Sequence, residues 1–238
     1  MSNSYFQFKQ FTVSQEKAAM KVCTDACLFG AVVASAIEKN EQIKTVLDIG
    51  TGTGLLSLML AQKSTAMIDA VEIDPDAEEQ AFKNFEKSPF QNRLTLIKSD
   101  IKEIEIKKNY DLVISNPPFF NNDLKTNNKQ KNIALHGEVL SLEDLLKVVI
   151  QLLKTGGIFW VLLPFHRAGF FIDVAHSHGL FLTDEVLVKQ TEKHSYFRAI
   201  LSFRQVKTTI KQSEIIIKKE GSYSEEFIEL LKDYYLYL

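Results

Sequence analysis

The chain has 238 residues and a mass of 27.1 kDa, with 45% hydrophobic and 24% charged side chains. This composition fits one large domain, or a domain with a small appendage, and it excludes disordered, collagen-like and mucin-like proteins. The formal net charge of −2 at pH 7 excludes a protein that coats nucleic acid through bulk positive charge, but it leaves room for a local basic patch.

Two cysteines, Cys23 and Cys27, are too few for a disulfide framework, and a second pair or nearby histidines for a zinc site are missing. We therefore expect two reduced, partly buried thiols. A basic and then apolar leader does not open the chain. The apolar stretch 26–37 is too short to span a bilayer, so we expect a cytoplasmic protein.

After a first stretch of about twenty residues, which we expect to form an arm, short apolar runs alternate with amphipathic segments from residue 44 onward. This alternation predicts a parallel, doubly wound α/β sheet, with its most apolar strand at or next to the centre. In chain order we predict a strand over 45–48, a helix over 53–61, a strand over 67–72, a helix over 75–87, strands over 94–98 and 110–115, a helix capped by Ser141 that ends before Gly156, and the most apolar strand over 158–163.

The pattern changes after Pro164. We predict a helix over 165–178 and then two strands, 181–188 and 197–203, whose short connection suits an antiparallel pair at the sheet edge. A further strand over 215–217 and a final helix that Ser224 caps, reaching residue 235, complete the chain.

Three of the ten glycines lie within five residues, directly after the first predicted strand, in Asp48-Ile-Gly50-Thr-Gly52-Thr-Gly54. Glycines there let the backbone approach a ligand closely, and the following helix offers unpaired N–H groups. The spacing is G-x-G-x-G, whereas a dinucleotide fold requires G-x-G-x-x-G. The flanking strand and helix favour a ligand-binding turn over a purely structural one.

Glu72 ends the next predicted strand, at the right point after the glycine turn. A carboxylate there can accept both ribose hydroxyls of an adenosine held over the turn, although acids at strand ends are often only solvated. Ile73 would then lie against the adenine face, and Asp100, after the following strand, could accept from the adenine amino group.

Asn116-Pro117-Pro118-Phe119 follows the strand over 110–115 directly, and the two prolines hold this segment stiffly extended. The Asn116 amide oxygen and the Pro117 carbonyl can both accept from one amino group, which pulls its lone pair out of conjugation and makes the nitrogen nucleophilic. Phe119 supplies a flat apolar face on which a flipped base could stack. A stiff turn without chemistry is the alternative.

The motifs at 48–54 and 116–119, in this order, resemble the class I S-adenosylmethionine-dependent methyltransferases, in the branch that acts on amino groups. Segments 8–11, 20–25 and 221–227 make the chain similar to bacterial enzymes that methylate the exocyclic N6 of the adenine just 3′ of the anticodon, adenine 37, in valine tRNA. The resemblance spans nearly the whole chain, and Cys23 stands where that family has Gly.

The resemblance implies an S-adenosylmethionine cofactor, a tRNA substrate and a Rossmann-like α/β fold with a seven-stranded, mostly parallel sheet whose last strand is antiparallel. It divides the chain into an N-terminal arm over 1–24 that completes the cofactor site, and a methyltransferase domain over 25–238 with C-terminal edge strands and a helix. The implied residues are Lys21, Thr24, Asp25, Asp48, Gly50, Gly52, Gly54, Glu72, Ile73, Asp100 and Asn116 for the cofactor; Asn116, Pro117 and Phe119 for catalysis; and Pro118, Phe119, Phe120, Lys125, Lys193 and Arg198 for the substrate.

The chemistry of such a site is placement more than acid–base force, because a sulfonium is already a strong electrophile. Asn116 and Pro117 would orient the adenine amino group, and the excess proton would leave to solvent. We expect no metal, since the five histidines lack ligand spacing, and no obligate protein partner is evident.

The nearest alternatives are methyltransferases that use the same cofactor on another substrate. Release-factor glutamine, rRNA guanine-N2 and DNA adenine methyltransferases share the motif Asn-Pro-Pro-Phe/Tyr. Glutamine enzymes usually carry a helical N-terminal domain, and DNA enzymes an inserted recognition domain. A nicotinamide-dependent oxidoreductase would need G-x-G-x-x-G. A non-catalytic RNA-binding module is the alternative of another class, and the intact motif at 116–119 argues against it.

The near-neutral net charge conceals an asymmetric distribution. Residues 186–219 contain eight Lys or Arg and two Glu, and residues 120–137 contain three Lys and one Asp, whereas the tail from Glu220 carries five acids and one Lys. Charge runs are often only solvated faces. Two basic segments that flank the motif at 116–119 nevertheless predict modest, salt-sensitive tRNA binding through one face.

Overall fold

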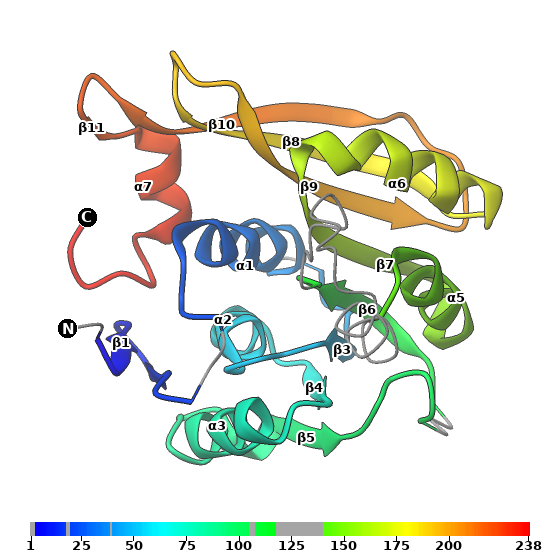
Figure 1. Ribbon diagram of the computed structural model, residues 1–238, viewed down its shortest axis with the longest axis horizontal. Coiled ribbons are helices and arrows are strands. Elements are labelled where there is room, and N and C mark those ends of the chain that lie inside the picture. Colours follow the sequence, from blue (N-terminus) through cyan, green and yellow to red (C-terminus); the bar gives the residue numbers. More distant parts are fainter. Residues whose placement is uncertain (1–2, 18–19, 39, 105–107, 118–139) are drawn as a thin grey trace, which may run out of the picture.

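The computed structural model describes residues 3–17, 20–38, 40–104, 108–117 and 140–238. A nine-stranded sheet runs through the molecule in the order β11-β10-β8-β9-β7-β6-β3-β4-β5, with helices on both faces (Figure 1). Its strands are β3 (Thr45–Ile49), β4 (Met67–Glu72), β5 (Leu94–Lys98), β6 (Tyr110–Ser115), β7 (Leu153–Pro164), β8 (Phe181–Thr191), β9 (Tyr196–Arg204), β10 (Lys211–Lys219) and β11 (Ser222–Tyr223).

The helices divide between the two faces of the sheet and enclose two apolar cores. Residues of α1 (Thr24–Ile37), α2 (Leu55–Lys63), α3 (Pro75–Glu86) and α7 (Glu225–Leu231) contribute to one core, and α5 (Leu142–Leu152) and α6 (Phe165–Ser177) to the other. Successive side chains of a strand point to opposite faces of the sheet. Along β3, Val46 therefore belongs to the first core, and Leu47 and Ile49 belong to the second. The parallel strands are therefore buried on both sides, as their apolar sequences predict.

The predicted α/β class and the alternating order are confirmed, and β7 is the central strand of the nine. The predicted strand count needs correction. Strands β5, β4, β3, β6, β7, β9 and β8 form the expected seven, with β9 antiparallel to both of its neighbours. The sheet then continues, because β10 pairs in parallel with β8 and β11 pairs with β10.

Three further predictions need adjustment. The antiparallel pair β8–β9 does not form the edge of the sheet, since β10 and β11 lie beyond it. The helix capped by Ser141 ends at Leu152, before Gly156 as predicted, but β7 begins at Leu153, five residues before the predicted strand over 158–163. The last helix is capped by Ser224 as expected but ends at Leu231, four residues before the predicted end.

The N-terminal arm folds into a hairpin of β1 (Tyr5–Gln7) and β2 (Thr12–Ser14). It lies on the same side of the molecule as the C-terminus (Figure 1). Phe8 pairs with Tyr235 in an isolated bridge, and the Lys9 N–H donates to the Tyr234 carbonyl at 2.8 Å. The arm is thus packed against the end of the chain.

Both cysteines are free thiols: Cys23 is exposed immediately before α1, and Cys27 is buried within it. Within the described parts of the chain, no helix has both the length and the apolar character needed to cross a membrane.

Candidate functional site

The glycine turn, residues 50–54, connects the carboxyl end of β3 to α2. Gly50, Gly52 and Gly54 have φ angles of +71°, +58° and +81°, which other residues rarely adopt. A methyl group added at Gly50 or Gly52 would meet no atom within 4 Å, whereas one at Gly54 would lie 2.4 Å from the Phe85 ring. The first two glycines therefore border open space, and the third allows close packing against α3.

Glu72, at the carboxyl end of β4, lies beside this turn and is 8% exposed. Its Oε2 accepts a hydrogen bond from the Gly52 N–H at 2.8 Å, and its Oε1 accepts from the N–H groups of Ile73 and Asp74 at 3.0 Å each. Three fixed donors hold the carboxylate at the turn; Oε1 already accepts two of them, so the remaining acceptor capacity lies on Oε2.

Asp48 lies beneath the turn and is fully buried. Its Oδ2 accepts from the Thr51 hydroxyl at 2.6 Å and the Ser57 hydroxyl at 2.7 Å, while its Oδ1 has no hydrogen-bond partner among the described residues. Burial raises the pKa of this carboxyl to about 6, and the nearby Glu72 charge acts in the same direction, against the two hydroxyl hydrogen bonds.

Two other predicted cofactor residues flank Glu72. Ile73 directly follows it and is 50% exposed, so an apolar side chain stands unburied beside the carboxylate. Asp100 lies just after β5 and is half-buried, where its carboxylate accepts from the Lys102 N–H at 2.9 Å and pairs with the Lys102 ammonium at 3.3 Å. The Ser99 N–H donates to the Glu72 carbonyl at 3.0 Å, which ties the segment around Asp100 to the end of β4.

Asn116 and Pro117 follow β6 directly, with Asn116 half-buried and Pro117 buried. Because β6 pairs in parallel with β3, with Ser115 opposite Ile49, the two residues leave the sheet at the same edge as the glycine turn. The Ser115 hydroxyl donates to the Ile49 carbonyl at 3.0 Å and fixes the two strand ends to each other. Four other predicted residues, Pro118, Phe119, Phe120 and Lys125, lie outside the described residues.

Thr24 and Asp25 are the first two residues of α1, and Lys21 lies three residues before it; Lys21 and Thr24 are exposed and Asp25 is half-buried. The Arg198 side chain, from β9, donates through Nε to Asp25 Oδ2 at 2.7 Å. Arg198 is therefore an ion-pair partner of a predicted cofactor residue. It lies at the same sheet edge as the turn, because it pairs in register with Pro164 at the carboxyl end of β7.

Comparison with known proteins decides the family. The family model of the methyltransferase small domain matches residues 29–166. A tRNA1(Val) (adenine(37)-N6)-methyltransferase of Dyadobacter fermentans is 43% identical over 240 residues, which cover 98% of each chain. Proteins of the same name from Pseudoalteromonas translucida and Trichodesmium erythraeum are each 41% identical and are matched over 99% of their length.

This chain belongs to the tRNA1(Val) (adenine(37)-N6)-methyltransferase family. The fold agrees with that assignment. A protein of Agrobacterium tumefaciens described as a predicted O-methyltransferase superposes with a TM-score of 0.67 at 16% identity, covering 88% of this chain and 96% of that one. The glycopeptide N-methyltransferase MtfA, in complex with S-adenosylmethionine, superposes with a TM-score of 0.54 at 11% identity, covering 74% and 93%.

Within this methyltransferase, two supporting residues were missed by the sequence analysis. Ser57 of α2 holds the Asp48 carboxylate, and Asn84 of α3 donates to the Thr53 carbonyl of the glycine turn at 2.9 Å. Asn84 is 1% exposed. A buried amide at an inward-facing helix position was the available signal, but the alternation of polar and apolar residues in α3 does not separate it from ordinary polar positions.

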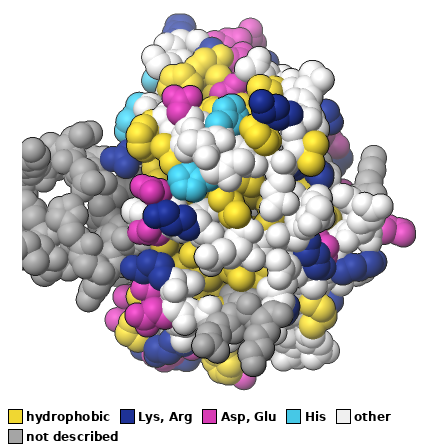
Figure 2. Space-filling view, turned by 90° about the vertical axis from the view of Figure 1, so that its right-hand side faces the viewer, with side chains coloured by type: hydrophobic (Ala, Val, Ile, Leu, Met, Phe, Trp, Pro, Cys, Tyr) yellow, Lys and Arg dark blue, Asp and Glu magenta, His cyan; other side chains and the backbone are white. Residues whose placement is uncertain are grey.

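The basic segment 186–219 is less available to a polyanion than its sequence suggests. Lys189 pairs with Glu214 at 3.1 Å and Arg198 pairs with Asp25, whereas Lys193 stands exposed in the turn between β8 and β9. Figure 2 shows the face on the right-hand side of Figure 1, where Lys and Arg side chains are interspersed with Asp and Glu among the described residues.

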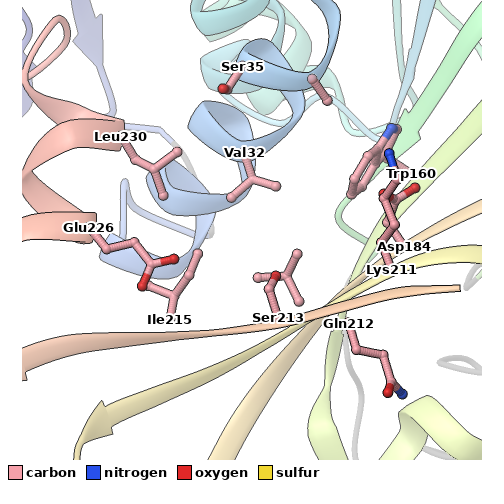
Figure 3. A pocket seen from close by; sticks show the side chains of 12 residues that line it. Val32, Ser35, Trp160, Asp184, Lys211, Gln212, Ser213, Ile215, Glu226 and Leu230 are labelled. Carbon is pink, nitrogen blue, oxygen red and sulfur yellow. The ribbon is translucent and has the colours of Figure 1, made fainter.

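A cavity of about 400 Å³ lies on the side of the sheet covered by α1 and α7 (Figure 3). Val32, Trp160, Asp184, Lys211 and Glu226 are among the residues that line it, and no residue of the glycine turn does. It is therefore separate from the site at the carboxyl edge. In the described ranges, no group of three or more His, Cys, Asp or Glu side chains is placed to hold a metal ion.

Proposed function

We propose that this protein transfers the methyl group of S-adenosylmethionine to the exocyclic N6 of adenine 37 in valine tRNA. The observation that carries the proposal is near-complete coverage by relatives of that name at about 40% identity, in a chain that keeps the glycine turn and Asn116-Pro117 at one sheet edge. A tRNA substrate is consistent with a cytoplasmic location.

The residues at the edge fit the proposed cofactor. Gly50 and Gly52 leave space that any side chain would fill, Glu72 presents a fixed carboxylate, and Ile73 offers an exposed apolar surface. A carboxylate that accepts ribose hydroxyls beside a glycine turn is a recurrent solution for adenosine binding. Lys21, Thr24 and Asp25 would hold the methionine part, and Asp100 would accept from the adenine amino group.

The orphan Oδ1 of Asp48 also fits this assignment. A buried carboxylate oxygen without a donor costs free energy, and such atoms concentrate at functional sites. We assign Asp48 to shaping the turn from below, through Thr51 and Ser57, rather than to direct contact with the ribose.

Catalysis in this scheme is the placement of a planar amino group. The Asn116 side-chain oxygen and the Pro117 carbonyl accept its two hydrogens, which turns the nitrogen lone pair away from the ring and toward the methyl donor. When bound, S-adenosylmethionine supplies an electrophilic methyl group on sulfonium. The protein contributes orientation, and solvent takes the excess proton. Phe119 would stack on the flipped base, and Pro118, Phe120, Lys125, Lys193 and Arg198 would contact RNA.

We further propose that the arm over 1–24 completes the cofactor site of the methyltransferase domain over 25–238. In support, Gln15 is 5% exposed and its Oε1 accepts from the Val22 N–H at 2.8 Å, one residue after Lys21. The arm therefore shapes the segment that leads into α1.

Nucleoside mass spectrometry of total tRNA from cells with and without this protein tests the function. We expect N6-methyladenosine to disappear from the valine tRNA fraction when the gene is deleted. An unchanged tRNA pool, or loss of a methyl mark from release factor, rRNA or DNA instead, would overturn the proposal.

A further inference from the structure

Asn84 bonds to two segments that are far apart in the sequence. It lies in the last turn of α3 and is almost fully buried. Its Oδ1 accepts from the Ser14 N–H at 2.9 Å, and its Nδ2 donates to the Ser14 carbonyl at 3.0 Å and to the Thr53 carbonyl at 2.9 Å. One amide group therefore bonds both the N-terminal arm and the glycine turn.

The two bonds to Ser14 pair its backbone N–H and carbonyl in the way that a neighbouring strand would. Ser14 lies opposite Tyr5 in the hairpin, and its own N–H and carbonyl are both bonded to the Asn84 amide. A side-chain amide carries one acceptor and two donors, so Asn84 satisfies this backbone position and still has a donor for Thr53. Ser14 is half-buried, so loss of both partners would leave its backbone groups only partly hydrogen-bonded and would cost free energy.

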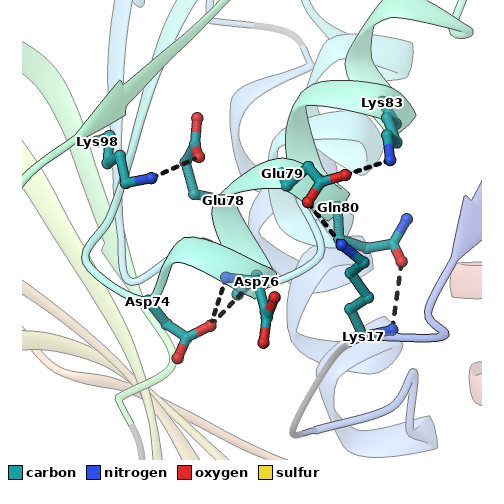
Figure 4. Close-up of polar contacts among 9 residues, drawn as sticks. Lys17, Asp74, Asp76, Glu78, Glu79, Gln80, Lys83 and Lys98 are labelled. Atoms are coloured by element: carbon teal, nitrogen blue, oxygen red, sulfur yellow. Dashed lines mark hydrogen bonds and ion pairs between the residues drawn. The ribbon is translucent and has the colours of Figure 1, made fainter.

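Two other polar contacts join the arm to α3. The Lys17 ammonium pairs with Glu79 at 2.6 Å on the surface, and the Lys17 N–H lies 3.4 Å from Gln80 Oε1 (Figure 4). Exposed ion pairs of this kind contribute little to stability. Neither contact involves a residue of the glycine turn, so they hold the arm without bonding to the site.

The glycine turn is held from α3 at two successive residues. Asn84 bonds the Thr53 carbonyl, and the Phe85 ring packs where Gly54 has no side chain. On the other side of the arm, the Gln15 side chain fixes Val22 next to Lys21. A shift of the arm would thus be transmitted to both ends of the proposed cofactor site.

We propose that Asn84 is a positioning residue that couples docking of the arm, residues 3–17, to the shape of the glycine turn and so to cofactor affinity. The inference rests on the proposed cofactor function. Coupling between two binding events is reciprocal. Cofactor binding must therefore strengthen docking of the arm, and weakened docking must lower affinity for the cofactor.

Hydrogen exchange of residues 3–17, with and without S-adenosylhomocysteine, tests the coupling in the full-length protein. We expect the ligand to slow exchange of the arm in the wild type. In Asn84→Ala, we expect the dissociation constant to rise about tenfold, the equivalent of one lost hydrogen bond, and arm exchange to stop responding to the ligand. Lys17→Ala is the matched control, since it removes an arm contact that does not touch the turn, and it should keep the response.

The outcomes separate the two claims. If S-adenosylhomocysteine does not bind the wild type, the proposed cofactor function fails and not the coupling alone. If it binds Asn84→Ala as tightly as wild type, or slows arm exchange equally in both, the coupling is overturned. If Asn84 had only a structural role, Asn84→Ala would speed hydrogen exchange of the arm, but S-adenosylhomocysteine would still slow that exchange. Should the variant not fold, wild-type exchange decides: an arm indifferent to the ligand overturns the coupling, and ligand-induced protection of the arm supports it.

Discussion

The backbone N–H of Gly52 donates to the carboxylate of Glu72 at 2.8 Å, across the gap between the glycine turn and β4. The residue proposed to bind the ribose is thus also one that holds the turn in place. Glu72 accepts three hydrogen bonds from backbone N–H groups, keeps acceptor capacity on Oε2, and is bonded to Gly52, which borders open space. Binding and support of the turn therefore act through one side chain.

Glu72→Ala should weaken both functions. We expect the dissociation constant for S-adenosylmethionine to rise about 10–100-fold, because hydrogen bonds to a charged group are lost. The free energy of unfolding should fall by about 1–3 kcal/mol, since backbone donors lose their acceptor. Calorimetric titration and chemical denaturation measure the two effects. Unchanged affinity would remove Glu72 from the ribose contact.

Asn116→Ala should separate binding from chemistry. The resemblance also places Asn116 at the cofactor, but the glycine turn and Glu72 stay intact in this variant, so affinity for the cofactor should stay within about twofold of wild type. The kcat should fall at least about 100-fold because the amino group loses its orientation. Single-turnover methylation and titration on the same preparations measure both. A parallel loss of affinity and rate would contradict the proposed role.

The two kinds of glycine in the turn should respond differently to alanine. Gly52→Ala imposes a cost of about 1–2 kcal/mol for its left-handed backbone and puts a methyl group into the open space, so cofactor binding should suffer most. Gly54→Ala adds a steric conflict with Phe85, and its thermal stability should fall further than that of Gly52→Ala. Equal melting temperatures for the two variants would be inconsistent with the packing described.

Asp48 predicts a specific pH dependence of stability. Its pKa rises from 3.8 to about 6 on burial, so between these values the folded state keeps a proton that the unfolded chain has released. Stability therefore falls as pH rises from about 4 to 6, by up to about 3 kcal/mol, and this contribution is constant above pH 6. The substitution Asp48→Asn removes the titratable carboxyl group and keeps an oxygen that can accept from the Thr51 and Ser57 hydroxyls.

We accordingly expect the melting temperature of Asp48→Asn, relative to wild type, to be higher at pH 8 than at pH 4. Differential scanning calorimetry at the two pH values measures the difference, and Asp100→Asn, at a half-buried position, serves as the control. A difference between Asp48→Asn and wild type that does not change with pH would show that Asp48 is not held in the state described.

The sequence was sufficient to predict the core of this fold. Alternating apolar and amphipathic segments located strands β3 to β9, because buried strands are rich in apolar residues, whereas the β1–β2 hairpin of the arm was not predicted. The extent of β10 was underestimated at 215–217, since its first residues, Lys211 to Glu214, are polar and exposed near the edge of the sheet. A search for apolar residues cannot detect a strand segment whose side chains are polar and exposed and which is held to its neighbour by backbone hydrogen bonds.

The site was predictable where it is local and not where it depends on tertiary contacts. The glycine turn and Asn116-Pro117 are short motifs, and register places them at one edge. The Asp25–Arg198 ion pair joins residues 173 positions apart, and Asn84 joins three segments. Neither has a sequence signature. The pairing of basic residues in segment 186–219 with acids was hidden for the same reason, because the Lys189–Glu214 ion pair depends on β8 and β10 being neighbours.

Methylation of defined tRNA by the purified protein tests the central claim most directly. Unmodified valine tRNA and a variant with guanine at position 37 are incubated with S-adenosylmethionine and digested to nucleosides for mass spectrometry. We predict one N6-methyladenosine per valine tRNA and none in the variant. Equal methylation of both RNAs, or of neither under conditions where the cofactor binds, would contradict it.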